Sequence, residues 1–143
     1  MRRYEILGHT ADLRLKVEGD SLPELFSAAL EGMANVMKVN FCSNPAGTEM
    51  AEEVILSAVD ATTLLIDFLS EVLTRSYQKK VVFCSTQFKY PPSNNSGRAT
   101  VKAKIFGFQI DGFDEDIKAV TYHEANIIKN AAGNYETNLV FDI

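Results

Sequence analysis

The chain has 143 residues, of which 46% are hydrophobic and 23% charged, an ordinary composition for a globular protein. No segment reaches the ~20 apolar residues that cross a bilayer, and the first residues lack the apolar core of a signal peptide, so we expect a cytoplasmic protein with no membrane partner. A net charge of −5 argues against broad binding to nucleic-acid phosphates, which depends on lysine and arginine.

Two extended segments precede the first predicted helix. Residues 4–7 form a short extended run, and residues 12–18 alternate strictly between apolar and charged side chains, which is typical of a half-buried strand. Ser21 then begins a capping box, in which its hydroxyl accepts from the Glu24 amide while the Glu24 carboxylate reaches back to the Ser21 amide. Apolar residues at spacings of three and four predict a helix from there to Met37.

A loop, a strand and a second helix follow. The asparagine, serine, proline and glycine content of residues 40–48 indicates the loop. Residues 52–59 predict the strand, and Asp60 stands where a helix N-cap is expected. Apolar side chains recur at helical spacing over residues 64–73, so this segment is predicted to be the second helix.

The second half of the chain predicts strands without helices. The strands are expected at residues 81–88, 99–106, 117–128 and 135–142, with loops at 89–97 and 107–116 and a turn at 130–134. Two helices among many strands, without repeated strand–helix–strand units, predict an α+β fold. We expect a mostly antiparallel β-sheet with both helices packed on one face, as a single compact domain spanning residues 1–143.

The two cysteines do not form a recognisable metal-binding pattern. Cys42 and Cys84 lack CxxC spacing and have no histidine pair nearby, so zinc binding is disfavoured. We expect both to pack as small, unpaired apolar side chains in a reducing cytosol.

Standard catalytic motifs are absent from the sequence. It contains no Walker-type phosphate loop, no GxSxG, no HExxH and no EF-hand loop. The two histidines, His9 and His123, have no nucleophile at a diagnostic spacing. Asp67 and Glu71, four residues apart on the second helix, and the acidic segment 114–118 are typical of solvated surface. We therefore expect a protein without catalytic residues.

Four segments together resemble one known family, the archeases. They are YEILGHTAD near the start, LLIDFLSEVL in the middle, IKAVTYHE later and VFDI at the end, in matching order and spacing over nearly the whole chain. The resemblance implies an accessory protein of the GTP-dependent RNA ligase of tRNA splicing and RNA repair. Such a protein promotes guanylylation of the ligase from GTP and its repeated turnover, so RNA would be contacted only indirectly, through the ligase.

The resemblance also implies a metal site. In archeases the aspartate of the HTAD motif lies beside the penultimate aspartate and the terminal carboxylate, which together hold a divalent cation. The matching positions here are Asp12, Asp142 and Ile143. Anionic oxygen ligands suit a hard cation, so calcium is expected first, with magnesium or manganese as alternatives.

Further positions near this site follow from the same resemblance. His9 and Thr10 are expected to orient a ligating carboxylate, as groups around a metal commonly do. Lys118 matches a functional lysine of the family, and its alternation with its neighbours points it off the apolar face. Gly8 stands where the family usually has aspartate, which removes one carboxylate close to the site but leaves the central ligands unchanged.

Two other functions stay open at this point. One is a chaperone-like modulator of nucleic-acid-modifying enzymes such as methyltransferases. The other is a metal-dependent phosphoesterase built on the same acidic residues. That enzyme would need a second metal or a positioned base, and the sequence offers neither clearly.

Overall fold

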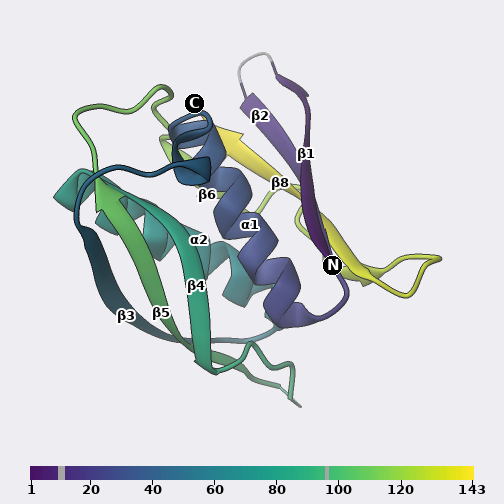
Figure 1. Cartoon of the computed structure of the whole chain (residues 1–143). Helices are drawn as coiled ribbons and strands as arrows, with labels where there is room; N and C mark the ends of the chain where they lie inside the picture. Colours follow the sequence, from purple (N-terminus) through teal and green to yellow (C-terminus); the bar gives the residue numbers. More distant parts are fainter. Residues whose placement is uncertain (10–11, 96) are drawn as a thin grey trace.

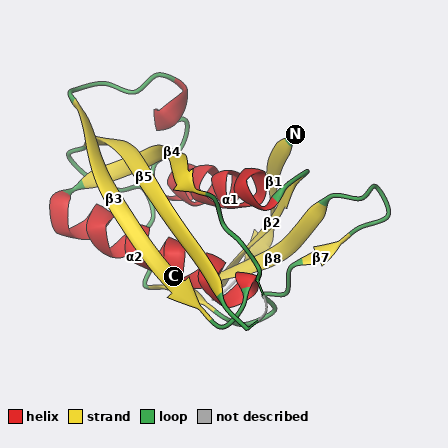
Figure 2. Ribbon diagram, turned by 90° about the horizontal axis from the view of Figure 1, so that it is seen from below, coloured by secondary structure: helices red, strands yellow, loops and turns green. Residues whose placement is uncertain are grey.

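The strands of the protein form two separate antiparallel sheets (Figures 1 and 2). The computed structural model describes residues 1–9, 12–95 and 97–143. Sheet A has the order β1 (Arg2–His9), β2 (Asp12–Gly19), β8 (Tyr135–Asp142) and β6 (Ala119–Thr121), with β7 (Ile128–Lys129) also paired to β8. Sheet B has the order β3 (Glu49–Ala58), β5 (Ala99–Gln109) and β4 (Val81–Tyr90).

Both helices contact strands of both sheets. Helix α1 (Leu22–Met37) packs on β1, β2 and β4, and helix α2 (Ala61–Lys79) packs on β3, β4, β5 and β6. The inner face of each sheet packs on the helices, and the outer face is the opposite one. The predicted α+β class, with antiparallel strands and two helices, is confirmed. The sequence did not indicate that the strands divide between two sheets.

The predicted helix starts are confirmed, with one correction. The Ser21 hydroxyl accepts from the Glu24 amide at 3.3 Å, and the Asp60 carboxylate accepts from the Thr63 amide at 2.8 Å. The reciprocal half of the capping box is wrong, because the Glu24 carboxylate accepts from the Arg2 guanidinium at 3.0 Å instead. A strand that lies beside the helix start thus supplies a better partner than the backbone amide.

The core lies where α1 crosses sheet A and where the helices meet. Leu15 and Val17, from the predicted alternating strand, are fully buried. Gly32 allows α1 to approach the sheet closely, since a Cβ there would lie 2.6 Å from the Leu15 side chain. Between the helices, the rings of Phe26 and Phe68 lie with their centres 5.8 Å apart.

The long strand predicted over residues 117–128 is wrong. The segment forms two short strands, β6 and β7, separated by a turn in which Glu124 adopts a left-handed φ of 61°. Between this turn and β7, two backbone amides donate to side-chain hydroxyls. The Asn126 amide donates to the Thr137 hydroxyl at 2.8 Å, and the Ile127 amide donates to the Thr62 hydroxyl at 3.1 Å.

The prediction of two unpaired cysteines is also wrong. Cys42 and Cys84 form a disulfide, with their Cα atoms 5.5 Å apart. The loop after α1 contains a short 3-10 helix, η1 (Phe41–Ser43), whose Phe41 ring packs edge-on against Phe108 of β5. This packing brings Cys42 to β4, a proximity that the spacing of the cysteines along the chain could not reveal.

Among the described residues, neither helix carries an apolar stretch long enough to span a membrane. The cytoplasmic location stays a prediction.

Candidate functional site

The strand register of sheet A brings two of the predicted site residues together. Asp12, the first residue of β2, is the direct cross-strand partner of Asp142, the last residue of β8. Directly opposed residues in antiparallel strands have Cα atoms about 4.5–5.5 Å apart, so their side chains share one small region. Asp12 is half-buried and Asp142 is exposed. Residues from the two ends of the chain therefore meet at one corner of the sheet.

This register is determined by the core. On the inner face, Leu13 pairs with Phe141 and Leu15 pairs with Leu139, and all four side chains are buried. Successive strand residues point to opposite faces, so the aspartates one position away lie on the outer face. A slip of one residue would turn the carboxylates into the core and expose the leucines, which makes the alternative pairing very unfavourable.

Lys118 lies next to the paired aspartates. Its backbone amide donates to the carbonyl oxygen of Asp142 at 2.7 Å, and Ala119 is the cross-strand partner of Asp142 on the side away from Asp12. The preceding residue, Ile117, is buried, and its carbonyl accepts from the Tyr77 hydroxyl at 2.9 Å. Lys118 is exposed, as predicted. The burial of Ile117 and the hydrogen bond to its carbonyl thus hold the backbone of Lys118 at this corner.

The last residue of the chain is held by packing. The Ile143 side chain is half-buried and lies against the main hydrophobic core. Chain ends are usually poorly ordered unless something ties them down. The packing of Ile143 therefore limits where its terminal carboxylate can lie, which is close to Asp142.

The remaining predicted residues are only partly described. His9 is the last residue of β1 and pairs with Leu13, while Gly8 pairs with Arg14 across the same two strands. The β1–β2 register thus places the backbone of Gly8 and His9 at the same corner as Asp12. Thr10 lies outside the described residues, so its predicted role stays a prediction, as does that of the His9 side chain.

The charges around the two aspartates do not neutralise them. Arg14, on the same face two residues after Asp12, forms an ion pair of 2.7 Å with Glu124, and the His123 Nε2 atom lies 3.5 Å from the same carboxylate. Within the described part of the chain, no ion pair involves Asp12 or Asp142. Like charges directly opposite each other across strands are destabilising. A bound cation would remove that cost.

The carboxylates at this corner can hold a hard cation only if the terminal carboxylate of Ile143 is also a ligand. Among the described residues, no three histidine, cysteine, aspartate or glutamate side chains gather closely enough to hold a metal ion. Asp12 and Asp142 supply two carboxylates, and the terminal carboxylate of Ile143 would supply a third. Three anionic oxygen groups with open positions for water suit calcium or magnesium better than a softer metal.

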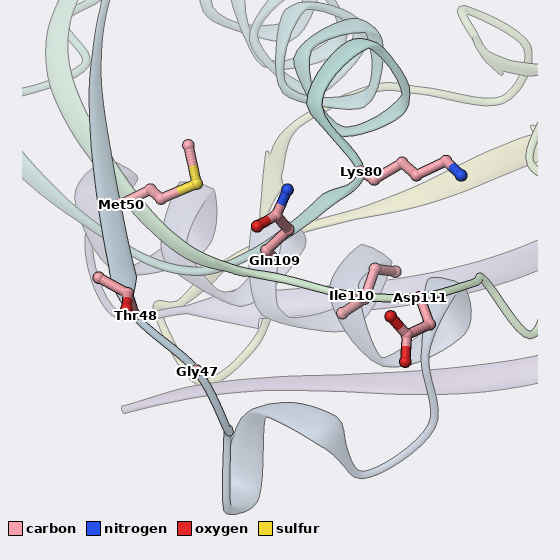
Figure 3. A pocket seen from close by; sticks show the side chains of 7 residues that line it. All are labelled: Gly47, Thr48, Met50, Lys80, Gln109, Ile110 and Asp111. Carbon is pink, nitrogen blue, oxygen red and sulfur yellow. The ribbon is translucent and has the colours of Figure 1, made fainter.

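A cavity elsewhere in the molecule does not contain these residues. It has a volume of about 650 Å³ and lies between sheet B and the end of α2 (Figure 3); its lining residues are Gly47, Thr48, Met50, Lys80, Gln109, Ile110 and Asp111. Figure 3 shows the Lys80 side chain extending away from Met50 and Gln109. None of the predicted site residues lines the cavity, so we keep the corner of sheet A as the candidate site.

The comparison with known proteins decides the family. The sequence model of the Archease protein family matches residues 4–143. The chain belongs to the archease family. It is 33% identical over 146 residues to the protein archease of Methanosarcina acetivorans, covering 99% of this chain and 97% of that one. It is also 33% identical over 147 residues to the protein archease of Pyrococcus abyssi, with 100% of both chains covered.

Two solved structures have a similar fold. The solution structure of protein 1598 of Methanobacterium thermoautotrophicum has a TM-score of 0.78 and 24% identity, with 98% of each chain covered. A crystal structure from Thermotoga maritima, described as an archease and possible chaperone, has a TM-score of 0.59 and 19% identity, covering 96% of this chain and 94% of that one. At these identities the likeness concerns the archease fold.

Sequence reasoning did not single out the Arg14–Glu124 ion pair. The strand pattern could have indicated Arg14, because a residue two positions after Asp12 in a strand lies on the same face as Asp12. No signal pointed to Glu124, whose position depends on the turn between β6 and β7. Together these two residues border the candidate site on its outer face.

Proposed function

We propose that this archease is a non-catalytic accessory protein that holds a divalent cation at Asp12, Asp142 and the terminal carboxylate of Ile143. The observation that carries the proposal is the cross-strand pairing of Asp12 with Asp142. Two carboxylates opposed on a solvent-facing corner, without a neutralising ion pair among the described residues, favour a cation between them. Calcium is the first candidate, and magnesium or manganese are alternatives.

Asp12 and Asp142 stand at the end of sheet A. Asp142 is exposed, so a cation there would keep coordination positions for water or for a group of a partner protein. When bound, a divalent cation stabilises negative charge on phosphate oxygens. The role of this chain is then to orient the carboxylates through the β2–β8 register and to present Lys118 beside them.

The partner that we propose is the GTP-dependent RNA ligase of tRNA splicing and RNA repair. The archease would promote guanylylation of the ligase from GTP and allow repeated turnover. The sequence supports a role in which the ligase performs the chemistry and the archease assists it, since it shows no recognisable nucleophile–base pair or phosphate-binding loop. We propose that the Lys118 side chain, which is exposed, contacts the ligase or its nucleotide.

Calorimetric titration with calcium tests the cation site. We expect binding by the wild type and its loss in Asp12→Ala and Asp142→Ala. Asp111→Asn is the matched control, because Asp111 is an exposed aspartate of sheet B's cavity and is not part of the site. A glycine added after Ile143 should also weaken binding, since it converts the terminal carboxylate into a peptide carbonyl. Equal binding by wild type and Asp142→Ala would disprove the site.

Transfer of labelled GMP to the cognate ligase tests the accessory role. Under multiple-turnover conditions, the wild type and Asp111→Asn should stimulate the transfer. Asp142→Ala should remove most of the stimulation, and Lys118→Ala should weaken it, with circular dichroism confirming that each variant is folded. Full stimulation by folded Asp142→Ala contradicts the proposal. Release of phosphate from RNA or GTP by the chain alone would instead support a phosphoesterase.

A further inference from the structure

The outer face of sheet B is distinct from the candidate cation site. Along the central strand β5, Val101, Ala103 and Ile105 are buried against the helices. The residues between them, Lys102 and Lys104, therefore point to the outer face. Two lysines on neighbouring outward positions give this face a cationic centre in a chain whose net charge is −5.

One end of this outer face is covered and the other is open. At the covered end, Phe41 of the disulfide-linked loop packs on Phe108. At the open end is a groove of about 460 Å³, lined by Ile55, Leu56, Ser57, Tyr90, Thr100, Val101 and Lys102. Tyr90 is 60% exposed and Ile55 is 64% exposed. A large aromatic side chain and an aliphatic one thus stand free beside the lysines.

One lysine lies near the exposed tyrosine, and an arginine lies on the other side of the groove. The Lys102 Nζ atom lies 5.8 Å from the centre of the Tyr90 ring, and Tyr90 is the cross-strand partner of Lys102. The Arg98 guanidinium donates to the Ser57 hydroxyl at 3.2 Å, which places it at the rim of the groove. One carboxylate opposes them: Glu53 is the cross-strand partner of Lys104, and its Oε2 atom lies 3.9 Å from the Lys102 ammonium. At the open end, cations outnumber this single carboxylate.

We propose that the open end of this face binds a short stretch of single-stranded RNA. An exposed aromatic ring on a sheet can stack with an unpaired base, and lysine or arginine beside it can neutralise the adjacent phosphates. The hydroxyls of Ser57 and Thr100 supply hydrogen-bonding groups within the groove. An acidic peptide would use the lysines but would gain little from Tyr90, so the aromatic ring favours nucleic acid.

This proposal is independent of the cation and of the ligase. It uses only residues of β3, β4, β5 and the loop before β5, whereas the candidate cation site belongs to sheet A. The net charge of −5 did not predict it, and the antiparallel pairing of β4 with β5 brings Tyr90 beside Lys102. The RNA would then touch this chain directly as well as through a partner.

Fluorescence anisotropy with a labelled oligouridylate of about ten nucleotides tests the proposal, a length within the range that small single-strand-binding modules cover. The full-length protein is used at about 50 mM salt with a chelator present. We expect Tyr90→Ala to weaken binding by about fivefold or more, since it removes the stacking surface. Tyr90→Phe should retain binding, because it keeps the stacking ring and removes only the hydroxyl, and circular dichroism should show that Tyr90→Ala is folded. Lys102→Gln should weaken binding and lower the salt dependence by about one phosphate contact.

The matched control is Lys129→Gln. The Lys129 Nζ atom lies 5.2 Å from the centre of the Tyr135 ring, so it forms the same kind of cation–aromatic pair on sheet A. We expect this variant to bind RNA as the wild type does. The proposal is overturned by absence of binding, by an equal loss in Lys129→Gln, or by equal binding of duplex RNA. Tighter binding of an acidic peptide than of RNA would overturn it in favour of a protein ligand.

Discussion

Each sheet of this protein is joined to a loop, but the two loops are joined by different interactions. On sheet B, the loop after α1 is attached by the Cys42–Cys84 disulfide and by the packing of Phe41. On sheet A, the side-chain amides of Asn130 and Asn134, in the turn between β7 and β8, donate to the Glu18 carboxylate of β2. The first attachment is covalent and apolar, and the second consists of hydrogen bonds from neutral amides to a charged carboxylate. The two loops should therefore respond to different conditions, namely reductant and acid.

The Glu18 carboxylate is almost fully buried, with 4% of the residue exposed, yet it remains charged. Its oxygens accept from the Asn134 side-chain amide at 2.9 Å, from the Asn130 amide at 2.7 Å and from the Arg3 guanidinium at 2.8 Å. These hydrogen bonds lower the pKa of Glu18 from its ordinary 4.5 to about 2. The charged form is thus strongly favoured in the folded protein.

The largest expected effect concerns the disulfide. It closes a loop of 42 residues, so its removal should lower the free energy of unfolding by about 2–4 kcal/mol. The Cys42→Ser/Cys84→Ser double variant, compared with the wild type by denaturant unfolding, measures this loss. Wild type treated with a thiol reductant should match the variant.

Hydrogen exchange would locate the same effect. Amides of residues 38–48 should exchange faster in the double variant, while those of sheet A keep their protection. An unfolding midpoint of the double variant equal to that of wild type would show that the disulfide does not stabilise the protein. An equal loss of protection in both sheets would show that its effect is not confined to sheet B.

A second substitution tests how closely the strands of sheet B pack. Gly107 of β5 lies opposite a bulge in β4, and a Cβ there would come within 2.5 Å of the Val82 carbonyl oxygen and 2.7 Å of the Val81 side chain. Gly107→Ala should therefore destabilise the protein by about 1–3 kcal/mol in thermal or denaturant unfolding. Gly112→Ala is the control, because a Cβ at that position meets nothing within 4 Å. Equal stability of the two variants would refute the close contact.

The third prediction separates sheet A from sheet B by pH. Because the folded pKa of Glu18 is below its ordinary value, its contribution to stability is present above about pH 4.5 and is lost as pH falls towards 2. Glu18→Gln should therefore be less stable than the wild type at neutral pH, and the difference should shrink in acid. Denaturant midpoints measured at several pH values follow this difference. If the difference in stability between wild type and Glu18→Gln stays constant down to pH 2, the lowered pKa of Glu18 is contradicted.

The smallest effect lies at the other end of sheet A. Without metal, Asp142→Asn removes one of two opposed charges and should raise stability by about 0.2–1 kcal/mol, as for other cross-strand pairs. In excess calcium the order should reverse, because a ligand that binds the folded state stabilises it. Thermal unfolding with chelator and with calcium measures both cases, and Asp111→Asn should show neither change. If calcium stabilises Asp142→Asn as much as wild type, the cation lies elsewhere.

The sequence alone determined the elements that depend on near neighbours. Ser21 and Asp60 were identified as helix caps because a side chain and an amide three residues later interact locally. The alternation over residues 12–18 predicted both the strand β2 and its buried face. The spaced motifs also indicated the archease family, which the comparison confirmed, and through it the residues of the candidate site.

Only the tertiary structure decided which distant segments meet. The turn at Glu124 and the disulfide of Cys42 with Cys84 both depend on groups far away in the chain, and the sequence-based expectations for both were wrong. The pairing of Asp12 with Asp142 was expected only from the family resemblance, and the strand register supplies its physical cause. Periodicity reports which face of an element is buried, but it carries no information on which other element buries it. That choice depends on how all the apolar faces can be covered at once.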